Sequence, residues 1–328
     1  MSGDFHMVAR TAGGPEVIER EDLAELAYGP SEVQVRTTAI GVNFIDTYHR
    51  SGLYPVAAPA PLGMEASGIV ERVGDGVTGI SEGDRVTMLL DRPGAYATKL
   101  VVPADRVIRL PDGIADEIAA ASLLKGLTAW MLAEPCSKLQ PGQNALVHSA
   151  AGGVGMLLVQ WLKKIGIRVI AHTGTSEKAV RARMLGADEA LSCPFDALAT
   201  EVGRLTGGRG VDVVLDGVGA ASWAASLAAT APRGLIVTYG NASGPVPPFS
   251  PQELNKAGSL FLTRPKLYDY IAEPGALQKA AGRLFGMIAD GALKVEIGQR
   301  FLLDRAADAH RALEARQTTG STILIPKQ

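Results

Sequence analysis

Cysteine is scarce in this chain, which has only Cys136 and Cys193 among its 328 residues. Two cysteines by themselves make neither a disulfide framework nor a four-ligand zinc site. An excess of charge of either sign is also missing, because 32 Lys and Arg stand against 34 Asp and Glu, a formal net charge of −2. This balance argues against a nucleic-acid partner, because proteins built around nucleic acids usually carry a basic patch or stripe.

Long hydrophobic runs are missing too. The most apolar tract, residues 147–162, is shorter than a membrane span and is interrupted by polar side chains and glycines. The first ten residues include Asp4 and His6 and contain no apolar segment of the kind that marks a secretory signal. We therefore expect a cytoplasmic protein with no membrane partner.

Glycine and apolar residues are plentiful by comparison. Hydrophobic residues make up 47% of the chain and charged residues 20%, enough to bury a sizeable core. Glycine provides 38 of 328 residues, about 12% against an average near 7%. Such a glycine content indicates tight turns and close backbone approaches, as nucleotide-binding loops need. The length predicts roughly two domains.

The sequence pattern changes along the chain. Between residues 8 and 110, short β-rich runs are separated by glycine and proline, which predicts an all-β, barrel-like unit. From about residue 124 to 264, buried strands alternate with helices, which predicts βαβ units and a doubly wound parallel sheet. The expected strands are 32–36, 68–73, 84–88, 144–148, 168–171, 211–215 and 235–239, and the expected helices of the middle region are 156–162 and 176–185.

The C-terminal tail returns to mixed structure. We expect a helix over 275–289, a strand over 293–295, a helix over 306–315 and a last strand over 321–325. This tail is too short for a domain and is expected to pack onto the N-terminal β unit. The predicted domains are therefore 1–123 with 265–328, and 124–264.

A glycine turn is the strongest local motif. Residues 150–155, AAGGVG, lie between a predicted strand and a predicted helix. Glycines there allow a tight bend and let the backbone approach a pyrophosphate, which faces the positive end of the helix. The usual fingerprint is G-x-G-x-x-G, with Ala150 here in place of its first glycine. A methyltransferase with an adenosyl cofactor could share this fold, so the fold alone leaves the ligand open.

The end of the second strand of that region bears on the choice of dinucleotide. An NAD-binding protein usually places Asp or Glu there, on the ribose 2′-hydroxyl. Residues 172–176, HTGTS, contain no carboxylate, and Lys178 and Arg181 follow Glu177. This predicts NADPH as the cofactor. In the alternative interpretation, Ser176 caps a helix and the two cations lie on its solvated face.

At these motifs the sequence resembles the zinc-independent quinone oxidoreductases, the NADPH:quinone reductases of the zeta-crystallin-like branch of the medium-chain dehydrogenase/reductase superfamily. The resemblance covers nearly the whole chain and implies a Rossmann domain inserted in a GroES-like β-barrel domain, an α/β fold. The segments that carry it are 13–17 (GGPEV), 39–48 (AIGVNFIDTY), 50–55 (RSGLYP), 125–128 (KGLT), 150–155 (AAGGVG) and 263–265 (TRP).

The resemblance also implies a set of site residues. The implied catalytic residues are Asn43, Tyr48 and Tyr54. In the alternative interpretation the two tyrosines have only a packing role. Asp46 is expected to orient their loop, and Lys125 either balances charge near the acceptor or lies on the surface. The implied cofactor-binding residues are Asn43 and Thr128 near the nicotinamide, Gly152, Gly153, Val154 and Gly155 at the pyrophosphate, Gly174, Thr175 and Lys178 at the adenosine ribose phosphate, and Gly240, Asn241, Thr263 and Arg264 along the rest of the groove.

Zinc is not expected. Zinc-dependent relatives have Cys where this chain has Asn43, and His before Glu where it has Met64 and Glu65. Without a Lewis acid, alcohol oxidation is hard to explain, whereas a quinone accepts hydride readily. Cys193 replaces an aromatic residue often found beside the 2′-phosphate, which weakens the expected preference for NADPH.

The sequence thus predicts an NADPH-dependent oxidoreductase that reduces a quinone or a similar electrophilic carbonyl. One alternative is a reductase of enone or alkenal double bonds, and another is a non-enzymatic NADPH-binding protein of crystallin-like or RNA-binding role. The resemblance further implies a homodimer that pairs through an edge strand of the Rossmann sheet, near residues 258–263.

Overall fold

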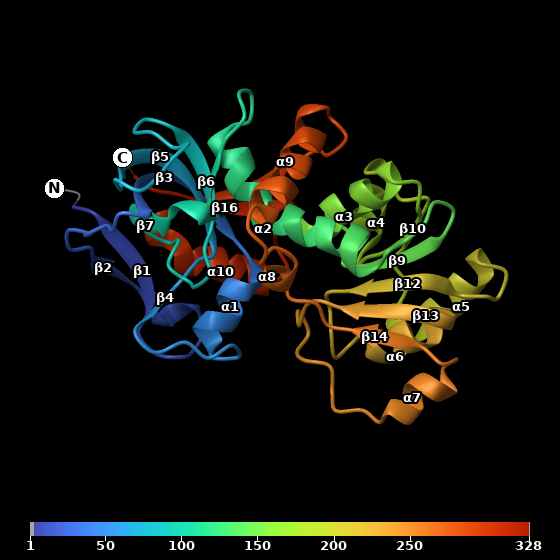
Figure 1. The fold of residues 1–328 in the computed structure, drawn as a ribbon. Helices are drawn as coiled ribbons and strands as arrows, with labels where there is room; N and C mark the ends of the chain where they lie inside the picture. Colours follow the sequence, from blue (N-terminus) through green and yellow to red (C-terminus); the bar gives the residue numbers. More distant parts are fainter. Residues whose placement is uncertain (1–2, 328) are drawn as a thin grey trace. The chain divides into compact units, whose positions relative to one another are not determined.

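Strands of two to eleven residues, most of them largely buried, build the first of two units in the computed structural model, which describes residues 3–327. This unit comprises the chain up to Leu127 and again from Ile271 onward. Its seven-stranded sheet has the order β15-β16-β3-β5-β6-β8, with β7 also paired to β3, and a smaller sheet has the order β2-β1-β4 (Figure 1). The strands are β1 (Phe5–Ala9), β2 (Ile18–Asp22), β3 (Glu32–Val42), β4 (Ala60–Pro61), β5 (Glu65–Val73), β6 (Arg85–Leu89), β7 (Lys99–Pro103), β8 (Val107–Arg109), β15 (Ile297–Leu302) and β16 (Ser321–Ile325).

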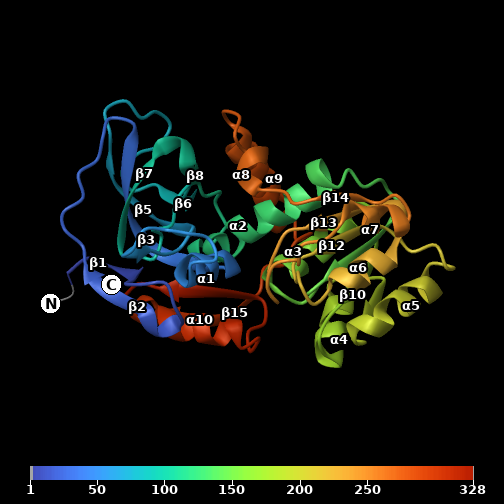
Figure 2. The same ribbon diagram turned by 90° about the horizontal axis from the view of Figure 1, so that it is seen from below.

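The C-terminal tail belongs to this first unit. Strand β16 pairs antiparallel with β3, with Thr322 opposite Val42 and Leu324 opposite Ile40. Figures 1 and 2 show the red C-terminal segment beside the blue strands of the N-terminal segment. The helical segments of the unit are η1 (Pro15–Val17), α1 (Phe44–Ser51), η2 (Ala104–Arg106), the first part of α2 (Asp116–Met131), α9 (Ala276–Ala289), η4 (Leu303–Arg305) and α10 (Ala306–Glu314).

The prediction of a strand over residues 293–295 is wrong. Leu293 is buried and its N–H donates to the Met287 carbonyl at 2.8 Å, so this segment is a turn that closes α9. The strand is β15 instead, which lies at the edge of the sheet and alternates half-buried with exposed residues. Its sequence, IGQRFL, contains glycine and two polar residues, so the alternation of burial does not show as an alternation of hydrophobic and polar residues.

An ion pair ties the first helix to the last one. Arg50, in the last turn of α1, is 3% exposed and donates from both Nη atoms to the Glu314 carboxylate of α10, at 2.6 and 2.9 Å. Asn43 is the N-cap of α1 and Tyr48 lies within it, so this ion pair fixes the helix that carries several of the predicted site residues.

A parallel sheet covered on both faces forms the second unit, Thr128–Tyr270. Its strand order is β11-β10-β9-β12-β13-β14. Successive strands are added on one side of β9 up to β11 and on its other side from β12 onward, so the junction of β9 and β12 is the switch point where ligands bind in such sheets. Figure 1 shows α3 and α4 on one side of this sheet and α6 on the other. The strands are β9 (Asn144–His148), β10 (Arg168–His172), β11 (Glu189–Leu191), β12 (Val211–Asp216), β13 (Thr230–Thr238) and β14 (Phe261–Thr263).

The helices of the second unit connect these strands. They are the end of α2, η3 (Leu132–Cys136), α3 (Gly153–Lys164), α4 (Ser176–Met184), α5 (Phe195–Leu205), α6 (Trp223–Ala229), α7 (Pro251–Lys256) and α8 (Leu267–Tyr270). The units divide after Leu127, inside α2, and after Tyr270, whereas the predicted boundaries lie four and six residues earlier. Among the described residues, no helix has both the length and the apolar character that crossing a membrane requires.

Candidate cofactor and substrate site

The glycine turn lies where β9 ends and α3 begins. Gly152 is the N-cap of α3, and its N–H donates to the Ser149 carbonyl at 2.8 Å. A Cβ on Gly155 would collide with that same carbonyl and would come within 2.8 Å of Ala150 Cα. Within residues 3–327 no side chain caps this helix, so the N–H groups of its first turn remain available to a ligand. The backbone therefore fits a dinucleotide pyrophosphate.

The segment after β10 runs beside this turn, because β9 and β10 are neighbouring parallel strands. Thr175 is the N-cap of α4, and its Oγ1 accepts the Lys178 N–H at 3.3 Å. The alternative in which Ser176 is the cap is therefore wrong. Gly174 and Thr175 are exposed and Lys178 is half-buried, which leaves a hydroxyl and a cation at this edge of the sheet.

A buried polar network underlies both segments. His148 and His172, the last residues of β9 and β10, approach through their Nδ1 atoms at 3.4 Å. His148 Nε2 lies 3.0 Å from Ser226 Oγ, which donates to the Asp216 carboxylate at 2.7 Å. Burial lowers the pKa of His148 to about 4, and burial also lowers the pKa of His172. Both rings are therefore neutral at pH 7 and form part of the packing beneath the turn.

A third cluster of predicted residues follows β13 and β14, at the same end of the sheet. Arg264 donates to Thr238 Oγ1 at 3.1 Å, to Asn241 Oδ1 at 3.1 Å and to the Gly240 carbonyl at 3.5 Å. The structure thus brings Gly240, Asn241 and Arg264 together, with Thr263 as the last residue of β14. Thr128 lies apart from this cluster in sequence, in α2.

Asn43, in the first unit, is held by a buried carboxylate. Its Nδ2 donates to Glu65 Oε1 at 2.8 Å, and Glu65 has no exposed surface. Glu65 also accepts the Leu124 N–H at 2.6 Å and lies 3.4 Å from Lys125 Nζ. Lys125 is 6% exposed, so the surface position considered for it is wrong. One carboxylate therefore joins β5 and α2 to the start of α1 and fixes the orientation of the Asn43 amide.

Asp46 holds the same turn from its other side. Its Oδ2 accepts the Asn43 N–H at 2.8 Å and the Tyr96 hydroxyl at 3.1 Å, and that hydroxyl lies 3.0 Å from His310 Nε2. Asp46 is fully buried, and its Oδ1 has no partner among the described residues. Burial, together with the smaller effect of the nearby Glu65 charge, raises the pKa of Asp46 to about 7. The hydrogen bonds from Asn43 and Tyr96 and the charge of Lys125 oppose this rise.

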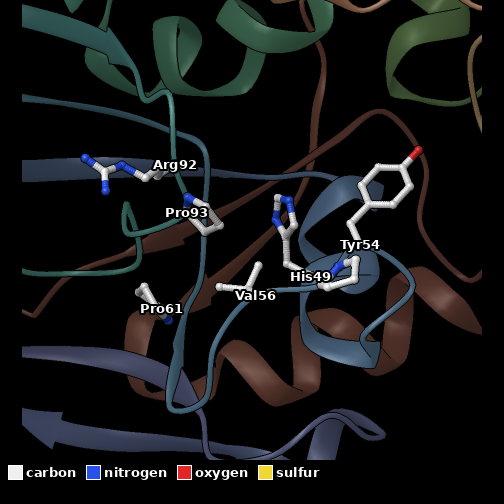
Figure 3. Close-up of a pocket in the computed structure, with 7 residues that line it drawn as sticks. His49, Tyr54, Val56, Pro61, Arg92 and Pro93 are labelled. Carbon is white, nitrogen blue, oxygen red and sulfur yellow. The ribbon is translucent and has the colours of Figure 1, made fainter.

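The two predicted tyrosines lie edge to face. The ring centroids of Tyr48 and Tyr54 are 5.3 Å apart, and the Tyr54 N–H donates to the Tyr48 carbonyl at 3.0 Å. Tyr54 also lines a cavity of about 680 Å³ within the first unit, together with His49 and Arg92 (Figure 3). The contacts of both phenols with a substrate stay predictions.

Comparison with known proteins identifies the family. A model described as "Alcohol dehydrogenase GroES-like domain" matches residues 29–112, and one described as "Zinc-binding dehydrogenase" matches residues 153–274. The chain is 47% identical to a quinone oxidoreductase of Pseudomonas aeruginosa, over 96% of this chain and 97% of that protein. The chain belongs to the quinone oxidoreductase family of the medium-chain dehydrogenases/reductases. This membership confirms the predicted fold class and shows that the protein is an oxidoreductase.

Two further relatives add detail to this family. The crystal structure of Escherichia coli quinone oxidoreductase complexed with NADPH matches with a TM-score of 0.96 at 42% identity, covering 98% of this chain and 100% of that one. A 2-haloacrylate reductase of a Burkholderia species is 39% identical over 98% of both chains. Despite the zinc in the description of one family model, the described residues contain no group of three or more His, Cys, Asp or Glu side chains that could hold a metal.

Several residues of the site were missed in the sequence analysis. Glu65 was considered only as the neighbour of Met64, although it begins a strand whose first four residues are buried, and a carboxylate in such a place needs an internal partner. Tyr96 and His310 are 214 residues apart in the chain, so no local pattern joins them. The Oδ1 atom of Asp46, buried and unpartnered, is likewise visible only in three dimensions.

The raised pKa of Asp46 predicts a pH-dependent stability. The native protein holds this proton up to about pH 7, whereas the unfolded chain releases it near pH 3.8, so the native state binds more protons between these values. Asp46 therefore lowers the free energy of unfolding as the pH rises through this window. Asp46→Asn removes this titration. Between pH 5 and pH 8.5 the free energy of unfolding of the variant should therefore rise by about 2–3 kcal/mol relative to that of the wild type.

Urea denaturation at both pH values measures this difference. Asp105→Asn, at an exposed position in η2, is the control for the loss of one carboxyl group. If the free energy of unfolding of both variants depends on pH in the same way relative to wild type, the raised pKa of buried Asp46 is contradicted.

Proposed function

We propose that this protein is an NADPH-dependent quinone oxidoreductase. The observation that carries the proposal is the turn before α3, where Gly155 leaves no room for a side chain and the helix has no side-chain cap within the described chain. Bound NADPH supplies the hydride, from C4 of its nicotinamide, to a quinone. The NADPH complex of the E. coli quinone oxidoreductase, 42% identical to this chain, supports the same cofactor here.

Each cluster of polar groups has a role in this proposal. The first-turn N–H groups of Gly153, Val154 and Gly155 bind the pyrophosphate, and Thr175 with Lys178 binds the adenosine 2′-phosphate, beside Gly174. The remaining cofactor-binding residues are Gly152, Thr128, Gly240, Asn241, Thr263 and Arg264. Cys193 provides no aromatic contact to the phosphate, so the charge of Lys178 carries most of the discrimination against NADH.

Asn43 faces the nicotinamide and its acceptor in this proposal, and Glu65 positions it. Because Nδ2 of Asn43 is engaged by Glu65 at 2.8 Å, the amide oxygen is held in one direction. Tyr48 and Tyr54 stabilise the negative charge that develops on the acceptor oxygen, and a tyrosine or water supplies the proton. Asn43 and Met64 replace the thiolate and imidazole of zinc-dependent enzymes, so the reaction proceeds without a metal.

A second candidate activity is reduction of an activated carbon–carbon double bond. The relative that favours it is the 2-haloacrylate reductase, 39% identical over nearly the whole chain. The same hydride geometry serves both acceptors, so product analysis with a quinone and with an enone separates them. The cytoplasmic location expected from the sequence stays a prediction.

Turnover with two cofactors tests the proposed function. We expect rapid oxidation of NADPH with 1,4-benzoquinone, unchanged by a chelator in metal-free buffer, and a kcat/KM at least tenfold lower with NADH. Lys178→Ala should lower kcat/KM for NADPH about tenfold and leave NADH unaffected, because only the 2′-phosphate loses its charged partner.

The exposed Lys164→Ala, at the end of α3, is the matched control for the loss of one lysine. Loss of activity with the chelator would contradict the metal-free reaction. Binding of NADPH without turnover on any quinone would favour the enone reductase or a non-enzymatic protein, and salt-dependent RNA affinity would identify the latter as RNA-binding.

The sheet edge supports a homodimer. Strand β14 is last in the strand order and pairs with β13 on one side, so its other edge has no partner within the described chain. Phe261 of this strand is 63% exposed, an unusual position for a large aromatic side chain. Pairing of β14 with its copy in a second chain would cover both the edge and the ring.

Multi-angle light scattering tests this assembly. Wild type should have the mass of a dimer, and Phe261→Asp should shift it to monomer by placing a charge in the interface. Met184→Asp is the control, because Met184 is an apolar residue of α4 that is 82% exposed and lies away from β14 in the chain. A monomeric wild type, or a dimer that Phe261→Asp leaves intact, would contradict pairing through β14.

A further inference from the structure

A chain of buried hydrogen bonds links the last turn of α1 to its first turn by way of α10. It begins at Arg50, whose Nη1 lies 3.4 Å from His310 Nδ1. His310 Nε2 lies 3.0 Å from the Tyr96 hydroxyl, which lies 3.1 Å from Asp46 Oδ2. His310, Tyr96 and Asp46 have no exposed surface. Figures 1 and 2 show α10, which carries His310, beside α1.

The chemistry of its members gives this chain one direction. A guanidinium only donates hydrogen bonds, so His310 Nδ1 accepts from Arg50. Burial and, to a smaller extent, the charge of Arg50 lower the pKa of His310 to about 3, so the ring is neutral and carries its proton on Nε2. His310 therefore donates to the Tyr96 oxygen, and the Tyr96 hydroxyl donates to Asp46. Every donor in the chain thus points toward the Asp46 carboxylate.

The backbone and the neighbouring ring hold Tyr96 in place for this role. Its N–H donates to the Leu62 carbonyl and its carbonyl accepts the Met7 N–H, both at 2.8 Å. A Cβ on Gly63, whose φ is +89°, would collide with the Tyr96 ring. That ring packs edge to face against the His310 imidazole, with the centroids 5.8 Å apart. The Tyr96 hydroxyl therefore has little freedom to turn away from the carboxylate.

Asp46 has fewer partners than a buried carboxylate usually needs. Its Oδ2 accepts the Asn43 N–H and the Tyr96 hydroxyl, whereas its Oδ1 is buried without a hydrogen-bond partner among the described residues. The charge of Lys125 on α2 favours the ionised form, and the charge of Glu65 on β5 opposes it. Within the part of the chain that the structure describes, the ionised form therefore relies on the two donors to Oδ2.

Ionisation of Asp46 tightens the turn at Asn43. The Asn43 N–H donates to Asp46 Oδ2 at 2.8 Å, and the Asn43 carbonyl accepts the Asp46 N–H at 3.1 Å. A hydrogen bond to an ionised acceptor is about twice as strong as one between neutral groups. Asp46 also lies in the first turn of α1, where the helix dipole favours a negative charge. The charge thus strengthens the hold on the residue that the proposed function places at the nicotinamide.

We propose that Asp46 is a positioning residue for Asn43, that its ionised form supports the faster hydride transfer, and that Tyr96 and His310 favour that form. The inference rests on the proposed function and adds the origin of its pH dependence. Asp46 gives no proton to the acceptor in this role, because it acts only by holding the turn whose amide faces the acceptor. The stability lost by burying its charge is exchanged for this orientation.

The pH dependence of a single turnover tests the proposal. With enzyme in excess over NADPH and with 1,4-benzoquinone as acceptor, wild type should oxidise NADPH at least fivefold faster at pH 8.5 than at pH 5.5. The reason is that the pKa of Asp46, raised by burial to about 7, lies between these values. Asp46→Asn should remove this dependence, with a rate at both pH values within twofold of the wild-type rate at pH 5.5.

Tyr96→Phe keeps the ring and removes the hydroxyl donor to Asp46. The midpoint of the rise in rate should then move up by about one pH unit, so that the rate at pH 7 is about fivefold below wild type and recovers toward pH 9. His310→Gln keeps a donor toward Tyr96 and should retain the wild-type midpoint, whereas His310→Leu should move it upward. Tyr28→Phe, at a tyrosine that is 42% exposed, is the matched control.

A purely structural role of these residues predicts a different result. Loss of packing would lower the rate by the same factor at every pH and leave the midpoint in place, which would overturn the inference. Infrared difference spectra between pH 6 and pH 8.5 add a measurement that does not depend on activity. Wild type should lose the C=O band of a protonated carboxyl, Asp46→Asn should lack this change, and Tyr96→Phe should shift it to higher pH. A wild type without this band would also overturn the inference.

The same experiment separates failure of the inference from failure of the proposed function. Turnover of 1,4-benzoquinone at a rate that Asp46→Asn leaves unchanged at pH 8.5 would overturn the inference and leave the quinone reductase intact. If no quinone supports oxidation of NADPH at either pH, the proposed function is overturned and the inference falls with it.

Discussion

The buried carboxylate of Glu65 organises the polar core of the first unit. It accepts hydrogen bonds from the Asn43 side chain and the Leu124 N–H, and Lys125 lies close enough to balance its charge. A carboxylate with no exposed surface is costly unless such partners surround it. The chain also makes room for it, because a Cβ on Gly41 of β3 would collide with Glu65 and with the Ala120 carbonyl. The approach of α2 to the sheet and the direction of the Asn43 amide thus depend on the same group.

The same carboxylate gives the Asn43 side chain a partner within the protein. The family resemblance implies that Asn43 and Met64 occupy the positions of a thiolate and an imidazole in zinc-dependent relatives, and in this chain the Asn43 amide donates to Glu65. The second unit uses a comparable solution beneath its glycine turn, where two neutral histidines, Ser226 and Asp216 pair with one another. In both units, buried polar side chains that pair with one another hold a backbone turn in one shape.

Sequence patterns predicted much of this structure and little of its polar core. Strands 144–148 and 321–325 agree with β9 and β16 because short apolar runs bounded by glycine or proline have few alternatives in a buried sheet. Strand β15 was missed because an edge strand with Gln and Arg lacks that signal. The family resemblance predicts that Gly240, Asn241 and Arg264 bind the cofactor. The structure brings the three residues together, and their contact with the cofactor stays a prediction. The contacts of Glu65, Tyr96 and His310 depend on pairs far apart in the chain, which local periodicity does not encode.

The turnover number of Glu65→Gln tests most directly whether this carboxylate positions Asn43. Gln keeps the size of the side chain and removes the charge that Lys125 and the Asn43 amide share. If Glu65 positions Asn43, kcat for NADPH-dependent quinone reduction falls at least tenfold, while the Kd for NADPH changes less than threefold and the circular dichroism spectrum stays native. A correctly folded variant with kcat within twofold of wild type would contradict this positioning role.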